Sequence, residues 1–113
     1  MKEIEKFMEE REKLDKIVMD YADMEIKRFY NLNSRVYNGN KIPSKYKEMM
    51  GLVASLVLRC DGCIKYHIKR CYDKGVDNEE FVELISIALI VGDSIIIPHL
   101  RDIFKNWKEL KNE

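Results

Sequence analysis

Two cysteines and a histidine stand close together in the stretch Cys60-Asp-Gly-Cys63-Ile-Lys-Tyr-His67. Two cysteines three residues apart at the start of a helix lie on one face and can form a disulfide. The unpaired N–H groups and the dipole at that end stabilise a thiolate, and CxxC settings lower the thiol pKa from about 8.5 to roughly 3.5–7.5. His67 lies one helical turn after Cys63, where its ring can carry a proton to or from the thiol, directly or through a water. The segment therefore predicts thiol redox chemistry.

A metal site is the first alternative for the same residues. Cys60, Cys63, His67 and Cys71 follow the spacing C-x2-C-x3-H-x3-C, which is similar to a zinc pattern. If residues 60–71 form one helix, its ends lie roughly 16 Å apart, too far to share one ion through bonds of about 2.0–2.3 Å. A three-ligand site from Cys60, Cys63 and His67 stays open, as does a structural role for inert thiols and a core histidine. We assign no metal to the segment and interpret Cys71 as a small core side chain.

The elements that must position these residues are predicted to be helices. Only five glycines and two prolines interrupt the chain, and no useful stretch alternates apolar and polar residues, so strands are not expected. We expect an all-α fold of about five to six helices. The helices are expected at residues 2 to about 37, 44 to 58 or 59, 60 to 74, 77 to 91 and 95 to 110.

Local signals mark several helix ends. Ser44 is predicted to be an N-cap. Gly75 is predicted to take the left-handed conformation that stops a helix. Asp77 and Glu80 are spaced as a capping box, with an apolar run after them.

The periodicity of apolar residues predicts which helix faces are buried. The apolar stripe of the second helix consists of Tyr46, Met49, Met50, Val53, Leu56 and Val57. The third helix is expected to bury Cys60, Cys63, Ile64, His67, Ile68 and Cys71 and to turn Lys65, Lys69, Arg70 and Asp73 outward. The fourth helix has almost no polar face over residues 81–91, and a monomer of 113 residues covers such a helix with difficulty, so we infer subunit contacts.

Composition limits the classes of partner and compartment. Twenty Lys+Arg balance twenty Asp+Glu, which argues against a nucleic-acid partner, and 46% hydrophobic residues argue against disorder. No apolar run reaches the roughly 18 residues of a membrane span, and the first sixteen residues have no apolar signal-peptide core. Three cysteines, an odd number, fit a reducing cytosol. We expect one cytoplasmic domain over residues 1–113, without a membrane partner.

The segment from residue 41 to residue 92 resembles the alkylhydroperoxidase D-like branch of the carboxymuconolactone decarboxylase family. The family pattern is a Glu, eleven residues, CxxC, three residues and a His, and Glu48, Cys60, Cys63 and His67 match it at every spacing. The resemblance covers about residues 25–105, and residues 1–24 form an N-terminal helical extension outside it. One departure is Gly62, which stands where better-studied members have a further His.

The resemblance implies an all-helical protein that works as a homo-oligomer, either a trimer or a hexamer, through thiol chemistry. Carried over residue by residue, Cys63 is the attacking thiol and Cys60 the resolving one, while Glu48 and His67 form the proton relay. The implied substrate is a small peroxide or a disulfide, and the protein needs no cofactor of its own. An external dithiol, such as a lipoyl group or another protein dithiol, would reduce it, which implies a redox partner protein.

These observations lead to one main functional hypothesis and two alternatives. The main hypothesis is a thiol-dependent peroxidase or disulfide oxidoreductase in which Glu48 accepts the proton of Cys63 through a water or His67. One alternative is a non-enzymatic, redox-responsive oligomer whose CxxC is a switch. The other is a decarboxylase-like enzyme acting on a small organic acid, but that branch of the family lacks the CxxC that this chain has at Cys60 and Cys63.

Overall fold

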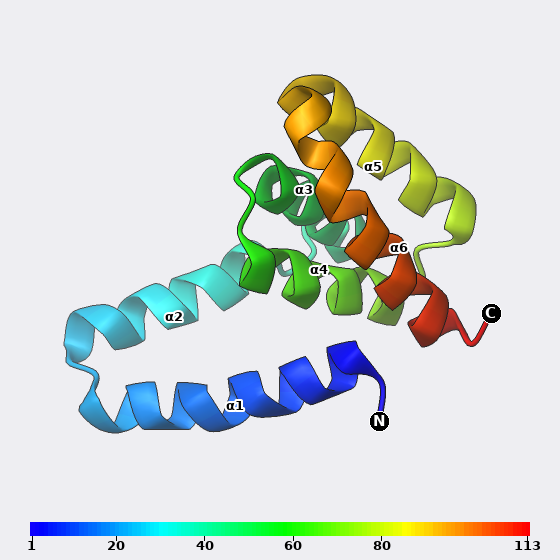
Figure 1. The fold of residues 1–113 in the computed structure, drawn as a ribbon. Coiled ribbons are helices and arrows are strands. Elements are labelled where there is room, and N and C mark those ends of the chain that lie inside the picture. Colours follow the sequence, from blue (N-terminus) through cyan, green and yellow to red (C-terminus); the bar gives the residue numbers. More distant parts are fainter.

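Six α-helices and one short 3₁₀ helix make up the chain in the computed structural model, which describes residues 1–113 and contains no strand (Figure 1). The all-α prediction is confirmed. In chain order the elements are α1 (Glu3–Tyr21), α2 (Met24–Val36), α3 (Ser44–Val57), α4 (Asp61–Asp73), α5 (Asn78–Gly92), η1 (Asp93–Ile96) and α6 (Ile97–Lys111).

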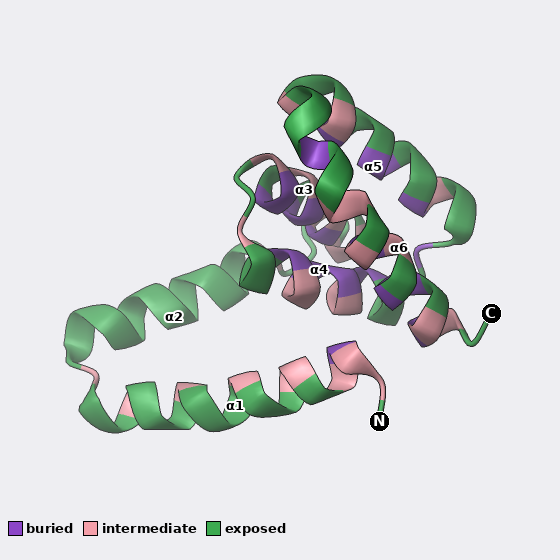
Figure 2. Ribbon diagram, in the orientation of Figure 1, coloured by how far each residue is buried: buried purple, intermediate pink, exposed green.

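The hydrophobic core lies among α3, α4, α5 and α6, where most buried residues are found (Figure 2). Phe81 of α5 stacks on Trp107 of α6, with ring centroids 4.0 Å apart and planes 7° from parallel. Leu52 and Leu56 of α3 are fully buried against this centre. Burying a side chain of this size stabilises a fold by about 1.5–3 kcal/mol. The core therefore fixes α3 against α4, the two helices that carry the predicted site.

The N-terminal region is an open hairpin of two helices, whereas one helix, straight or bent, was expected over residues 2 to about 37. That prediction is wrong at Ala22 and Asp23, where the helix ends and a new one begins. Ala22 is extended, with φ −63° and ψ 134°, and the Asp23 carboxylate accepts the backbone N–H of Ile26 as an N-cap. Such a local side-chain bond competes with helix continuation. Ile4 anchors α1 in the core, but α2 has no buried residue (Figure 2).

The predicted helix-end signals have mixed outcomes. Gly75 has a positive φ of 80° after α4, and Asp77 and Glu80 form both bonds of the capping box of α5, so both predictions are confirmed. Ser44 is not a cap, because α3 is preceded by Pro43 and no side chain bonds its first N–H groups. Proline is tolerated at this place, because the N–H that it lacks would have no hydrogen-bond partner within the helix.

The segment from α5 to α6 is long and apolar enough to meet a membrane-span criterion. Within the stretch Asn78–Lys111, the most apolar 18 residues have a mean hydropathy of 2.1. The core helices of soluble proteins can be equally apolar. Asp93, with φ 65°, and the 3₁₀ turn η1 divide the run, so that α6 folds back along α5 (Figure 1). Ile90 and Val91 remain exposed by 85% and 65%, so one chain does not cover this helix.

Candidate active site

Helices α3 and α4 place Glu48 and His67 in direct contact. His67 Nδ1 lies 2.9 Å from Glu48 Oε1, although the two residues are 19 apart in sequence. Glu48 is 1% exposed and His67 6% exposed. The structure thus brings together the carboxylate and the imidazole that the family pattern pairs.

Glu48 is held as a buried carboxylate by two nitrogen donors. Its second oxygen, Oε2, accepts a hydrogen bond of 3.2 Å from Nε of Arg70. Burial raises the pKa of Glu48, but the hydrogen bonds and charges of His67 and Arg70 outweigh burial and hold the pKa below its usual 4.5. Arg70 was expected to face outward, and this is wrong: its side chain is half-exposed and turns its Nε toward the site. Arg70 lies one helical turn after His67, so the helical period carried a signal for it.

The ionised state of Glu48 fixes how His67 is protonated. A carboxylate only accepts hydrogen bonds, so Nδ1 of His67 carries the proton and donates it. In the neutral ring Nε2 is then an acceptor, and it faces the hydroxyl of Tyr37 at 3.4 Å. Both ring nitrogens therefore have protein partners. No three His, Cys, Asp or Glu side chains are grouped so that they could hold a metal ion, and the three-ligand zinc alternative finds no support in this geometry.

The two site cysteines lie at the N-terminus of α4 and are unpaired thiols. Cys60 is the N-cap residue, and its Sγ accepts the backbone N–H of Cys63 at 3.4 Å. Cys63 was expected on the buried stripe, but it is exposed, while Cys60 is half-buried. An exposed thiol can be reached by a substrate, and its neighbour Cys60 is placed three residues before it.

The predicted lowering of the thiol pKa is not found at Cys63. A hydrogen bond with Cys60, burial and the charge of Cys60 raise the pKa of Cys63, and only Arg11 opposes them. The physical reason is that the free N–H at the helix start points to the sulfur of Cys60, and two thiols side by side cannot both ionise readily. A nucleophile in this position needs a base to take its proton.

Cys71 takes no part in the site. It is fully buried in the core, as the sequence indicated. Burial and then the charge of Glu48 raise the pKa of its thiol to about 12. The thiol is therefore protonated at every physiological pH and unreactive.

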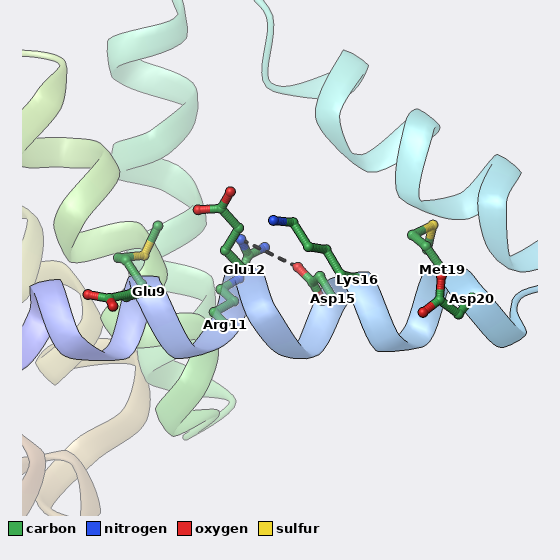
Figure 3. A pocket seen from close by; sticks show the side chains of 8 residues that line it. Glu9, Arg11, Glu12, Asp15, Lys16, Met19 and Asp20 are labelled. Carbon is green, nitrogen blue, oxygen red and sulfur yellow. Dashed lines mark ion pairs between the residues drawn. The ribbon is translucent and has the colours of Figure 1, made fainter.

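Helix α1 reaches the site from outside the predicted set of residues. The guanidinium of Arg11 lies 4.0 Å from the ring centroid of Tyr66, the residue before His67. Arg11 also belongs to an open hollow of about 830 Å³ along α1, where Glu12 and Lys16 point into the space between α1 and α2 (Figure 3). Neither Arg11 nor Tyr37 could be found from the motif, because each belongs to a helix that the motif does not include.

Comparisons with known proteins agree with this fold. The family model described as the carboxymuconolactone decarboxylase family matches residues 26–106. Two solved structures of the Thermotoga maritima protein TM1620 are each 50% identical to the chain. They cover 95% of it, and 94% and 91% of their own chains, with TM-scores of 0.92 and 0.90. In the second of these structures, TM1620 is described as a carboxymuconolactone decarboxylase family protein with a candidate role in an antioxidative response. No curated protein matches. The chain is a member of the carboxymuconolactone decarboxylase family.

Proposed function

We propose that the protein is a thiol-dependent peroxidase or disulfide oxidoreductase in which Cys63 attacks and Cys60 resolves. The observation that carries the proposal is an exposed CxxC thiol beside a buried Glu48–His67 pair. A polar pair of this kind is costly to bury, so it is expected where it serves chemistry. The antioxidative role suggested for TM1620 supports the same reading.

The proposed reaction has two thiol steps. The Cys63 thiolate attacks one peroxide oxygen, the O–O bond breaks, and a sulfenic acid forms while an alcohol or water leaves. The Cys60 thiol then attacks the sulfenic sulfur, an S–S bond forms, and water leaves. An external dithiol reduces the disulfide by thiol exchange and is itself oxidised. With a disulfide as substrate, the thiolate attacks sulfur instead, and the resolving step releases the second thiol.

The geometry supports a particular division of the relay between its two members. The lowered pKa of Glu48 makes it a poor final acceptor of a proton at neutral pH. We therefore place the accepted proton on His67, with Glu48 as the carboxylate that orients the ring and stabilises the imidazolium. This modifies the sequence-based hypothesis, in which Glu48 was the acceptor.

The surroundings of the reaction also belong to the proposal. The substrate would be a small peroxide or disulfide. The reductant would be a lipoyl group or a protein dithiol. The protein would act in the reducing cytoplasm, where CxxC thiols can be regenerated. The working unit would be a homo-oligomer. The exposed apolar residues of α5 support this last point.

Peroxide turnover with a dithiol donor tests the proposed function. Purified protein should consume an organic peroxide over many cycles with dihydrolipoamide as the reductant. Cys63→Ser should abolish this turnover. The control is Cys71→Ser, which makes the same change at the buried cysteine and should leave turnover in place. Activity that persists in the Cys63 variant would disprove the assignment. A protein that oxidises once and then changes its assembly would instead be the redox switch.

A further inference from the structure

Tyr37 contacts His67 on the ring nitrogen that Glu48 leaves free. Its hydroxyl lies 3.4 Å from Nε2, and the two ring centroids are 5.1 Å apart at an angle of 47°. Tyr37 is the C-cap residue of α2 and lies outside the family motif of Glu, two Cys and His. With Glu48 on Nδ1 at 2.9 Å, a proton can reach the ring only through the Tyr37 oxygen or after that hydrogen bond breaks.

A glycine of α3 makes the approach of the two rings possible. A Cβ at Gly51 would lie 2.7 Å from Cε1 of His67 and 2.8 Å from the hydroxyl oxygen of Tyr37. Both distances are too short for any side chain. Gly51 is a helix-interior residue, where glycine destabilises by about 1 kcal/mol relative to alanine, so its presence marks a close approach.

Lys47 fixes the backbone on both sides of Tyr37. Its Nζ donates hydrogen bonds of 2.8 Å to the carbonyl oxygens of Val36 and Asn38. Because no residue of α2 is buried, packing of the helix does not explain where Tyr37 lies. The two hydrogen bonds from Lys47, the residue before Glu48, hold Tyr37 against the Glu48–His67 pair instead.

From this geometry we propose that Tyr37 couples the Cys63 thiol to His67, its hydroxyl donating to Nε2 in the resting enzyme and to the thiolate after ionisation. The inference rests on the proposed role of Cys63. Cys63 lies one helical turn before His67 on α4, so its thiol is on the helix face that carries the His67 ring. Electrostatics supports the same link, because burial and then the charge of Glu48 raise the pKa of Tyr37, and the charge of Cys63 adds a smaller effect in the same direction. The titratable and charged groups that face this cluster are Glu48 from α3, Cys60, Cys63, Tyr66 and Arg70 from the α4 region, and Arg11 from α1.

The ionisation step transfers protons only and leaves all electrons in place. The S–H bond of Cys63 breaks and its proton passes to the oxygen of Tyr37, while the hydroxyl proton of Tyr37 passes to Nε2 of His67. The products are a thiolate, a neutral phenol and an imidazolium whose Nδ1 remains bonded to the Glu48 carboxylate. Without the hydroxyl, the thiolate loses a hydrogen bond to a donor and the ring loses its link to the thiol.

Alkylation of Cys63 against pH tests the coupling in the intact protein. Iodoacetamide modification, quantified at Cys63 by fragment-ion mass spectrometry, should slow about tenfold at pH 7 in Tyr37→Phe, because the apparent pKa of the thiol rises by about one unit. The matched control is Tyr66→Phe, since the ring of Tyr66 packs edge-on against the same His67 ring at 5.1 Å. This control should keep the wild-type profile. An unchanged profile in Tyr37→Phe, or an equal shift in both variants, would overturn the inference.

A second measurement does not depend on how the variant folds. Nitrogen-15 NMR of His67 in the reduced wild-type protein should show the tautomer protonated on Nδ1, and a ring protonated on Nε2 would contradict the proposal. Alkylation uses neither peroxide nor reductant. Failure of peroxide turnover would therefore disprove the proposed function and leave the coupling of Tyr37 intact. An unchanged alkylation profile in Tyr37→Phe would disprove the coupling and leave the proposed function intact.

Discussion

Glu48 contributes to the stability of the fold through its buried charge. Its pKa is lower in the folded chain than the usual 4.5, so its contribution is present above pH 4.5 and is lost as the pH falls through the lower folded value. We expect Glu48→Gln to destabilise the protein by about 2 kcal/mol at pH 7, the range for hydrogen bonds to a charged group. Urea unfolding at pH 7 and at pH 3.5 measures this, and the difference from wild type should shrink at the lower pH.

The control for this experiment is Glu83→Gln, which removes an exposed carboxylate of α5. It should change the free energy of unfolding by less than about 0.5 kcal/mol at either pH. An equal loss in both variants would mean that burial of Glu48 does not set its contribution.

The three cysteines should differ sharply in reactivity. Burial and the charge of Glu48 raise the pKa of Cys71 to about 12, whereas Cys63 is exposed. In the native protein at pH 8, iodoacetamide should therefore label the CxxC pair and leave Cys71 unmodified until denaturant is added. Peptide mapping before and after unfolding checks this, and native labelling of Cys71 would refute its assignment to the core.

At the residue scale, the sequence was sufficient for part of the site. The CxxC pair and His67 stood out in the sequence itself, whereas Glu48 was added only by the resemblance to the family. The structure brings Glu48 to His67 at 2.9 Å. Tyr37 could not be found in this way, because only the path of the chain after α2 places it near His67. The raised pKa of Cys63 could not be predicted from the sequence either. A position at the start of a helix does not say which of the two sulfur atoms accepts the free N–H, and here it is Sγ of Cys60.

At the scale of elements, α1 connects the N-terminal extension to the thiols. Arg11 lies on the ring of Tyr66 and is the one group that lowers the pKa of Cys63. Arg11→Gln should therefore raise the thiol pKa and slow alkylation of Cys63 at pH 7 by about threefold, since half a pKa unit is about a threefold change. The same pH profile used for Tyr37 measures it.

Lys13→Gln is the control for Arg11, because it removes the same charge from α1 at a residue that is exposed and pairs only with Glu9 at 3.9 Å. Its profile should match wild type, and it should do so at high salt as well as low. If both variants slow alkylation equally, the effect belongs to the net charge of α1 and the specific place of Arg11 is irrelevant.

The ends of helices were predictable where neighbouring residues alone carry a strong signal. The capping box of α5 and the positive φ of Gly75 needed only neighbouring residues. The break before α2 was missed because Asp23 is one of twenty acidic residues, and neither Gly nor Pro marks it. In α3 the predicted stripe is confirmed in part, because Leu56 is fully buried and Met49 and Val53 pack against the core. The most buried face is rotated toward Glu48 and Leu52, which tertiary contacts decide and periodicity does not.

At the scale of the whole molecule, much apolar surface remains uncovered. Only 20 of 113 residues are buried, and α2 exposes a row of large apolar side chains. A groove of about 630 Å³ between α3 and α5 is lined by ten apolar residues, among them Val53, Ile87 and Val91. Exposed apolar areas of this kind mark contact surfaces in soluble proteins. Of the α3 stripe that periodicity selected, Tyr46 and Met50 remain exposed, and we expect this edge to contact a further copy of the chain.

The mass in solution should therefore exceed the 13.5 kDa of one chain. We expect light scattering after size exclusion to give a trimer or hexamer, and Ile87→Lys to shift it toward the monomer, because a charge in the apolar groove is costly to bury. Ser86→Lys adds the same charge at the neighbouring exposed residue, outside the groove lining, and should leave the mass unchanged. A wild-type monomer would contradict the expectation outright. An Ile87→Lys oligomer of wild-type mass would move the contact away from this groove, and the exposed face of α2 would be the next surface to alter.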